Sequence, residues 1–259
     1  MLGAIAGDIV GSVFEFDNLR DRDFPLFAED ATFTDDTVLT VALAETLLHG
    51  GDYAEAMKRW YARYPNVSYG GRFREWAQGY RRGPYNSWGN GSAMRVSPVG
   101  WAFDALETVL DQAAGSAAPT HDHPEGIRGA QAVAGSIFLA RWGGDKAEIR
   151  RLCEGRFGYD VGESIDSLRE HYRFTESCQG TVPPAVRAFL EAGDFEDALR
   201  NAVSLGGDSD TLACIAGAIA EAFFGVPDWI EREVCDRLDP ALAGITRAFR
   251  RRFVPGGAA

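Results

Sequence analysis

Apolar residues recur at helical spacing through most of this chain, and this pattern constrains the fold more than any other feature. Alternating runs rich in Val, Ile and Thr, which would indicate strands, are nearly absent. The sequence therefore predicts an all-α protein. Helices are expected at residues 2–14, 36–49, 52–63, 70–80, 92–103, 104–113, 125–141, 145–152, 160–168, 181–192, 194–204, 209–224 and 227–237.

No change in composition marks a linker, so residues 1–259 are expected to form a single domain. A chain of this length buries a sizeable core without disulfides. Its four cysteines lack the spacing of a zinc site, its N-terminus lacks the basic segment of a signal peptide, and no apolar stretch is long enough to span a bilayer. We expect a cytoplasmic protein with reduced thiols, and a monomer by default.

The formal net charge of −12 argues against a nucleic-acid coat or an anionic membrane as a partner. Any anionic ligand would have to be held locally, by backbone amides or a bound cation.

Three glycines, Gly3, Gly7 and Gly11, are spaced four residues apart in the first predicted helix. Each costs about 1 kcal/mol of helix stability relative to alanine, so close packing against another backbone is expected to compensate. Asp8 and Glu15 project from nearly the same side of this segment. Considered as an isolated pair, they are most simply interpreted as solvated carboxylates.

Two segments, 34–37 (TDDT) and 208–211 (DSDT), place carboxylates and hydroxyls at the start of very apolar helices. Either segment alone is typical of helix capping. Capping needs only one oxygen per helix, however, and buried helices would bring four carboxylates together, where their mutual repulsion favours a bound cation. An all-oxygen ligand set without His or Cys selects Mg²⁺ or Mn²⁺, and the excess of carboxylates suggests two ions.

A glycine-rich turn at 86–95 (NSWGNGSAMR) leads into an apolar stretch. Such turns present backbone N–H groups to phosphates, although most Gly-Asn-Gly turns are only turns. Trp88 within it suggests base stacking. A further segment, 120–126 (THDHPEG), holds two of the four histidines; hydrogen bonding to a ligand or helix capping is favoured there over metal binding.

Together these residues resemble the ADP-ribosylglycohydrolase family, which includes the dinitrogenase-reductase-activating glycohydrolases and the human ADP-ribosyl-acceptor hydrolases. The resemblance covers nearly the whole chain. Its motifs, in order, are G7-D8-x-x-G11-x-x-x-E15-F16, T34-D35-D36-T37, G89-N90-G91-S92-A93-M94-R95, T120-H121-x-H123-P124 and G206-G207-D208-S209-D210-T211, followed by A216-G217-A218.

The resemblance implies an orthogonal bundle of α-helices around a cleft that holds two Mg²⁺ or Mn²⁺ ions. It implies hydrolysis of the bond between ADP-ribose and a protein or small-molecule acceptor. The implied metal ligands are Thr34, Asp35, Asp36, Asp208, Asp210 and Thr211, and the implied catalytic residues are Glu15, Asp36 and Asp208. The implied ADP-ribose contacts are Ser87, Trp88, Gly89, Asn90, Gly91, Ser92, Met94 and His121, with Tyr85 as the alternative to Trp88 for adenine stacking.

Several points stay open at this stage. Residues 50–85 and 143–179 contain no motif that identifies the acceptor, so arginine, serine and an acetyl ester all remain candidates. Two other functions compete with the hydrolase: a catalytically silent ADP-ribose-binding module, and a structural Mg²⁺ or Ca²⁺ site in an unrelated helical enzyme. Six carboxylates are expected to face one cleft, namely Asp8, Glu15, Asp35, Asp36, Asp208 and Asp210. Four arginines are expected on a solvated face, from which one could reach a phosphate: Arg72, Arg74, Arg81 and Arg82.

Overall fold

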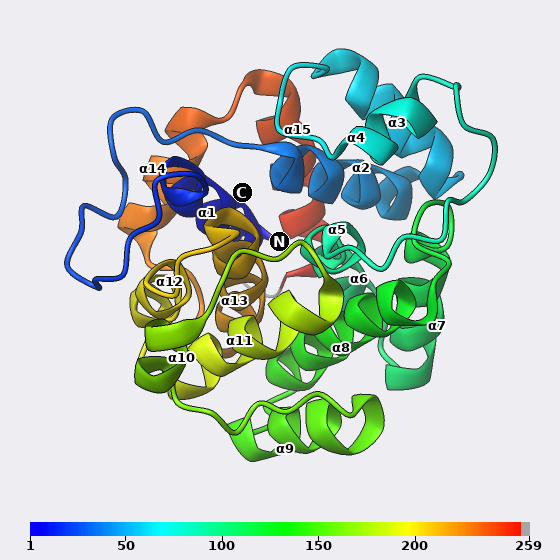
Figure 1. The fold of residues 1–259 in the computed structure, drawn as a ribbon. Helices are drawn as coiled ribbons and strands as arrows, with labels where there is room; N and C mark the ends of the chain where they lie inside the picture. Colours follow the sequence, from blue (N-terminus) through cyan, green and yellow to red (C-terminus); the bar gives the residue numbers. More distant parts are fainter. Residues whose placement is uncertain (255–259) are drawn as a thin grey trace.

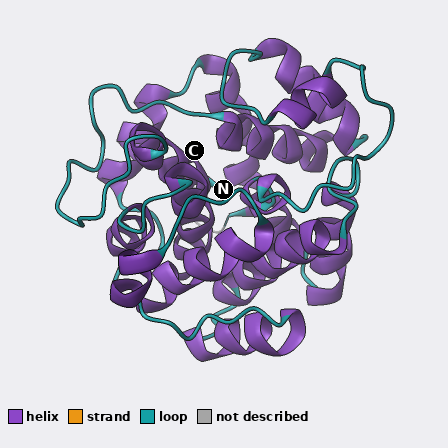
Figure 2. Cartoon of the chain, in the orientation of Figure 1, coloured by secondary structure: helices purple, strands orange, loops and turns teal. Residues whose placement is uncertain are grey.

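The computed structural model describes residues 1–254, and within this range the chain forms helices and no strand (Figures 1 and 2). The all-α prediction is confirmed. A 3₁₀ turn at Ser12–Phe14 follows the first helix, and a π turn at Leu152–Arg156 follows the ninth. The α-helices are α1 (Leu2–Gly11), α2 (Asp35–His49), α3 (Tyr53–Arg63), α4 (Gly71–Ala77), α5 (Gly91–Met94), α6 (Ser97–Ala102), α7 (Leu106–Ala117), α8 (Pro124–Arg141), α9 (Lys146–Arg151), α10 (Ile165–His171), α11 (Cys178–Glu191), α12 (Phe195–Val203), α13 (Ser209–Phe224), α14 (Asp228–Arg237) and α15 (Pro240–Phe253).

Some predicted helices have different bounds in the structure. The segment 92–103 is two short helices, α5 and α6, and Pro98 lies in the first turn of α6, where its missing N–H costs no helical hydrogen bond. The helix expected at 160–168 begins only at Ile165, after the capping residue Ser164. Helix α15 was not predicted, although Asp239 and Pro240 form a good helix start.

Helix α13 is the centre of the fold, and every residue from Ser209 to Glu221 is buried. Helices α1, α8, α11 and α12 pack around it. Helix α2 begins with buried residues and packs against α1, so the N-terminal ends of α2 and α13 both lie inside the protein (Figure 1).

The glycines of α1 allow it to lie directly on α13. A Cβ atom on Gly3, Gly7 or Gly11 would overlap the backbone of α13, at Gly217, Ala213 and Asp210 respectively. The expected close approach of another backbone is therefore confirmed. It places Asp8, which follows Gly7, beside the N-terminal turn of α13.

No helix in the described part of the chain is long and apolar enough to cross a membrane. The monomeric state and the cytoplasmic location stay predictions.

Candidate active site

Asp8 holds the start of α2 in place. One carboxylate oxygen accepts hydrogen bonds from the backbone N–H groups of Thr34 and Thr37, at 2.9 and 3.0 Å, and from the Thr37 hydroxyl. The other oxygen accepts from the Thr34 hydroxyl at 2.6 Å. Asp8 is fully buried, so the interpretation of Asp8 as a solvated carboxylate is wrong.

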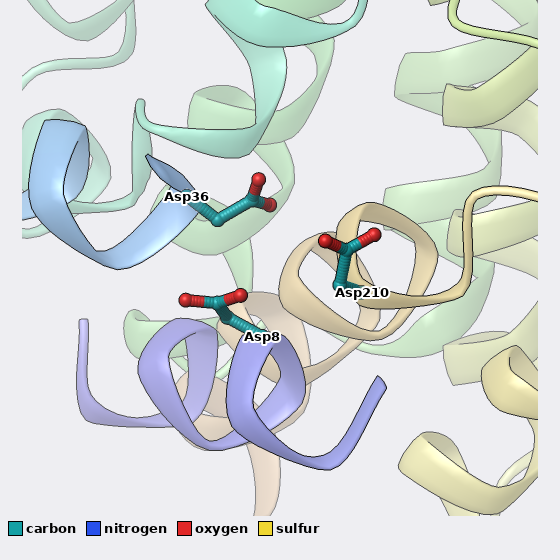
Figure 3. Close-up of side chains that lie close together, drawn as sticks. All are labelled: Asp8, Asp36 and Asp210. Atoms are coloured by element: carbon teal, nitrogen blue, oxygen red, sulfur yellow. The ribbon is translucent and has the colours of Figure 1, made fainter. Parts of the chain in front are cut away.

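Carboxylates from separate helices converge next to Asp8. Oxygens of Asp8, Asp36 and Asp210 lie within 4.8 Å of one another, and their side chains point toward a common space between α1, α2 and α13 (Figure 3). Oxygens of Glu15, Asp208 and Asp210 form a second group of the same size. Asp210 belongs to both groups, so its carboxylate connects them.

A glycine turn positions the carboxylates of α13. Gly206 and Gly207 both have positive φ, at 68° and 77°, a conformation that other residues rarely adopt. The chain can thus turn sharply into α13, which begins after Asp208.

Burial and mutual repulsion raise the pKa values of these carboxyl groups. Burial, and then the charge of Asp208, raises the pKa of Glu15 to about 7. Burial, and then Asp8, raises the pKa of Asp35 to about 8. The pKa values of Asp36 and Asp210 are raised well above their usual range, again by burial first. A divalent cation would oppose these shifts, because it stabilises the ionised carboxylates and neutralises their mutual repulsion.

The donor set fits a hard divalent cation. Asp36 Oδ1 is buried and accepts no hydrogen bond from the described residues. Its other oxygen, Oδ2, accepts a long hydrogen bond of 3.4 Å from the Thr211 hydroxyl. Asp8 differs, because hydrogen bonds from the start of α2 occupy both its oxygens. Within residues 1–254, Asp36 therefore has an oxygen available to a cation, whereas Asp8 is a structural anchor beside the cluster.

The glycine-rich loop is tied to this cluster through Asn90. Its side-chain amide donates to Asp208 Oδ2 at 2.7 Å and to the Thr181 hydroxyl at 3.0 Å. Its backbone N–H donates to the carbonyl of Glu176 at 2.7 Å, and the Gly89 N–H donates to Ser87 Oγ at 3.1 Å. The backbone N–H groups of Gly89 and Asn90 therefore form hydrogen bonds within the protein and are not available to a ligand.

His121 lies against the same loop. The ring is buried, and its Nδ1 is 2.7 Å from the Thr120 hydroxyl. A Cβ on Gly91 would lie only 3.2 Å from His121 Nε2, so glycine there allows the loop to approach the ring. Burial, and then the charge of Arg95, lowers the pKa of His121 well below its usual value, so the imidazole is neutral.

These groups line one cleft of about 490 Å³, a volume typical of small-molecule sites. The acidic cluster lies at one part of its wall and the glycine loop at another. Of the predicted residues, the following line it: Glu15, Asp35, Asp36, Asp208, Asp210, Thr211, Ser87, Trp88, Gly89, Asn90, Gly91, Met94 and His121.

Two predicted residues lie outside the lining. The Thr34 hydroxyl donates to Asp8 and accepts from the Asp36 N–H at 3.3 Å, which is the geometry of a helix cap. The Ser92 hydroxyl is fully buried and donates to the carbonyl of Gly126 at 2.6 Å, tying α5 to α8. Asp35 lines the cleft but belongs to neither group of close carboxylates.

Two charged residues of the cleft, Glu176 and Arg95, had no role predicted from the sequence. Glu176 lies beside the loop, but nothing in its surrounding sequence marks it. Arg72 lies 6.0 Å from the Trp88 ring, so one of the arginines expected on a solvated face does reach the cleft. Arg95 is fully buried, and a lone arginine at the start of the apolar stretch VSPVGW could have signalled this.

A helical bundle whose buried helix starts present carboxylates to a cleft, beside a glycine-rich loop, is the arrangement of an enzyme or ligand-binding protein whose acidic cluster could hold a metal ion. The comparison with known proteins is more specific. The model of the ADP-ribosylglycohydrolase family matches residues 1–255. The chain belongs to this family of enzymes, as its motifs predicted.

Relatives from distant organisms cover most of the chain. The ADP-ribosylarginine hydrolase Tri1 of Pseudomonas putida (strain GB-1) is 29% identical, over 90% of this chain and 72% of its own. The ADP-ribosylhydrolase ARH3 of Homo sapiens is 26% identical, over 87% and 84%. The ADP-ribosyl-[dinitrogen reductase] glycohydrolase of Rhodospirillum rubrum is 28% identical, over 81% and 79%.

A solved structure described as an "ADP-ribosylglycohydrolase-related protein complex" has the same fold. The TM-score is 0.71 at 26% identity, and the alignment covers 96% of each chain. The predicted bundle type is thus confirmed.

Proposed function

We propose that this protein is a metal-dependent hydrolase that cleaves the bond between ADP-ribose and a protein or small-molecule acceptor. The observation that carries the proposal is that the carboxylates of Asp36, Asp208 and Asp210 converge in the cleft, with oxygens of Asp210 within 4.8 Å of both others. They account for two Mg²⁺ or Mn²⁺ ions, held by Asp36, Asp208 and Asp210 with Asp35 and Thr211 beside them. When bound, such ions orient ribose hydroxyls and a water molecule, and stabilise negative charge.

The charge distribution along the cleft supports one orientation of ADP-ribose. The carboxylates suit the ribose and its cations, whereas Arg95 and Arg72 line the cleft near the glycine loop. In residues 1–254, no carboxylate lies within ion-pairing distance of the buried Arg95 guanidinium. Its positive charge near the glycine loop is therefore not neutralised by a neighbouring side chain. A diphosphate placed there would be attracted despite the negative net charge of the chain.

Glu15 is suited to proton transfer at the bond that breaks. Cleavage at the anomeric carbon develops oxocarbenium character and requires a proton for the leaving group and a base for water. Without ions, burial and the charge of Asp208 raise the pKa of Glu15 to about 7, and bound cations would lower it and favour the carboxylate that accepts a proton from water. It lies in the acidic group with Asp208 and Asp210, at the ribose end of the proposed ligand position.

The adenine base is proposed to lie on Trp88. Its indole is 46% exposed and flanked by Arg72, an arrangement open to stacking. Tyr85 also lines the cleft, but it is more buried than Trp88 and offers less open ring surface. Trp88 is therefore favoured over Tyr85.

The test is release of free ADP-ribose from ADP-ribosylated arginine, ADP-ribosylated serine peptide and O-acetyl-ADP-ribose. The purified protein is incubated with each substrate and Mg²⁺ or Mn²⁺. Release from at least one substrate, abolished by chelation, is expected. Tight binding of ADP-ribose without release from any substrate would instead favour the silent binding module.

A further inference from the structure

A chain of buried side chains connects Arg95 to His121 through Thr120. Arg95 Nη2 donates to the Thr120 hydroxyl oxygen at 2.8 Å and to the Ser116 carbonyl at 3.2 Å. The same hydroxyl oxygen lies 2.7 Å from His121 Nδ1. Arg95, Thr120 and His121 are each at most 5% exposed, so solvent does not compete for these contacts.

The contacts determine where the hydroxyl proton of Thr120 lies. A guanidinium only donates, so Arg95 occupies a lone pair of the Thr120 oxygen. Two acceptors lie within hydrogen-bond distance of the hydroxyl oxygen, His121 Nδ1 at 2.7 Å and the Ala117 carbonyl at 3.5 Å, and the Tyr85 phenol is a further neighbour of Thr120. The shorter contact is a good hydrogen bond and the longer one is at the limit. The hydroxyl therefore donates to Nδ1.

A neutral imidazole that accepts at Nδ1 carries its proton on Nε2. Burial and the nearby Arg95 charge both lower the pKa of His121, which keeps the ring neutral. Tyr85 stays protonated, because burial raises its pKa to about 12. The backbones of Gly89 and Gly91 lie beside Nε2 of the ring.

We propose that Arg95 and Thr120 are positioning residues that fix His121 as the Nε2–H tautomer, so that it donates one hydrogen bond to an oxygen of the ligand in the cleft. The identity of that ligand rests on the proposed function, whereas the tautomer is a property of the free protein. Nε2–H of His121 can then bind only to ligand atoms that accept a hydrogen bond, such as ribose or phosphate oxygens. His121 does not serve as a general base.

The tautomer is measured on the unmodified protein, without ligand. Two-bond ¹H–¹⁵N correlation spectra of protein labelled with ¹⁵N-histidine distinguish a protonated ring nitrogen from an unprotonated one. The chain has four histidines, and the spectrum of His121→Gln assigns the signal. At pH 7 we expect a protonated Nε2 and an unprotonated Nδ1. The Nδ1–H tautomer, an imidazolium, or fast exchange between tautomers would overturn the proposal.

A pair of substitutions tests the role of the relay. Thr120→Val keeps the shape but removes the hydroxyl, and Thr120→Ser keeps the hydroxyl. We expect Thr120→Val to lose the single tautomer and to bind ADP-ribose about tenfold more weakly, a loss typical of one hydrogen bond to a charged group. Thr120→Ser should restore both. His49→Gln is the control, because His49 is exposed in the last turn of α2 and does not line the cleft.

The results separate the two proposals. An unchanged tautomer and unchanged affinity in Thr120→Val would refute the relay while leaving the proposed function intact. The expected tautomer in a protein that binds no ADP-ribose would refute the proposed function and, with it, the assignment of the hydrogen-bond acceptor. If Thr120→Val does not fold, the spectrum of the unmodified protein still decides the tautomer.

Discussion

Gly7→Ala is expected to separate the two helices that carry the acidic cluster. The added Cβ would meet the carbonyl of Ala213 and the amide of Cys214, both backbone atoms in the middle of α13. Neither helix can shift easily, because Gly3 and Gly11 make similar contacts one turn to either side. The strain therefore has no flexible side chain to absorb it.

The magnitude follows from two opposing terms. Alanine is about 1 kcal/mol better than glycine inside a helix. Overpacking in a tight core costs about 1–3 kcal/mol and more where only backbone can move. Because all the contacts of this Cβ are backbone, we expect a net loss of about 2 kcal/mol in the free energy of unfolding. For a domain of this size that corresponds to a melting temperature about 4–8 °C lower.

The assay is thermal and urea unfolding of the metal-free protein, with Gly115→Ala as the matched control. Gly115 is also inside a helix, α7, but its added Cβ would meet nothing within 4 Å. That substitution should stabilise the protein by about 0.5–1 kcal/mol. A Gly7→Ala protein as stable as Gly115→Ala would refute the close-packing argument.

Three further predictions concern the site. Asp8→Asn replaces one carboxylate oxygen, which accepts hydrogen bonds, by an NH₂ group, which cannot accept them. This substitution should lower the free energy of unfolding by about 2–3 kcal/mol, measured by urea unfolding in the presence of a chelator. The exposed control Asp166→Asn should change it by less than about 0.5 kcal/mol. Without metal, the pKa values of Glu15 and Asp35 are raised to about 7 and about 8, so below these values the folded protein holds protons that the unfolded chain has lost. The stability that these protons contribute is lost as the pH rises through 7 and 8. Calorimetry should therefore show a larger stabilisation by Mg²⁺ at pH 8 than at pH 5.5, and an equal effect at both would contradict the proposed cation site. Trp88→Ala should weaken ADP-ribose binding about tenfold in a calorimetric titration, with Trp88→Phe retaining most of the affinity; a loss in Tyr85→Ala but not in Trp88→Ala would move the adenine to Tyr85.

The sequence predicts those features that depend on local pattern. Helical periodicity locates most helices, and the glycine spacing in α1 predicts its backbone contact with α13. The acidic starts of α2 and α13 predict that their carboxylates meet, because buried apolar helices must begin inside the protein.

The features that sequence did not predict depend on tertiary contacts. Whether Asp8 is solvated or buried depends on the start of α2, a segment more than twenty residues away. Thr34 and Thr37 share similar chemistry with Thr211, but only the structure shows which hydroxyls serve as helix contacts and which line the cleft. The buried position of Arg95 likewise results from packing between α5, α7 and the loop before α8.

The most direct test of the account is the rate of ADP-ribose release as a function of free Mg²⁺ or Mn²⁺, measured for the unmodified protein and for Asp210→Asn. Asp210 belongs to both carboxylate groups, so its loss should affect both ions. We expect saturable activation by the metal in the unmodified protein, and a rate at least about a hundredfold lower in Asp210→Asn at the same metal concentration. Release that continues unchanged in chelator, or an Asp210→Asn protein with full activity, would contradict the account.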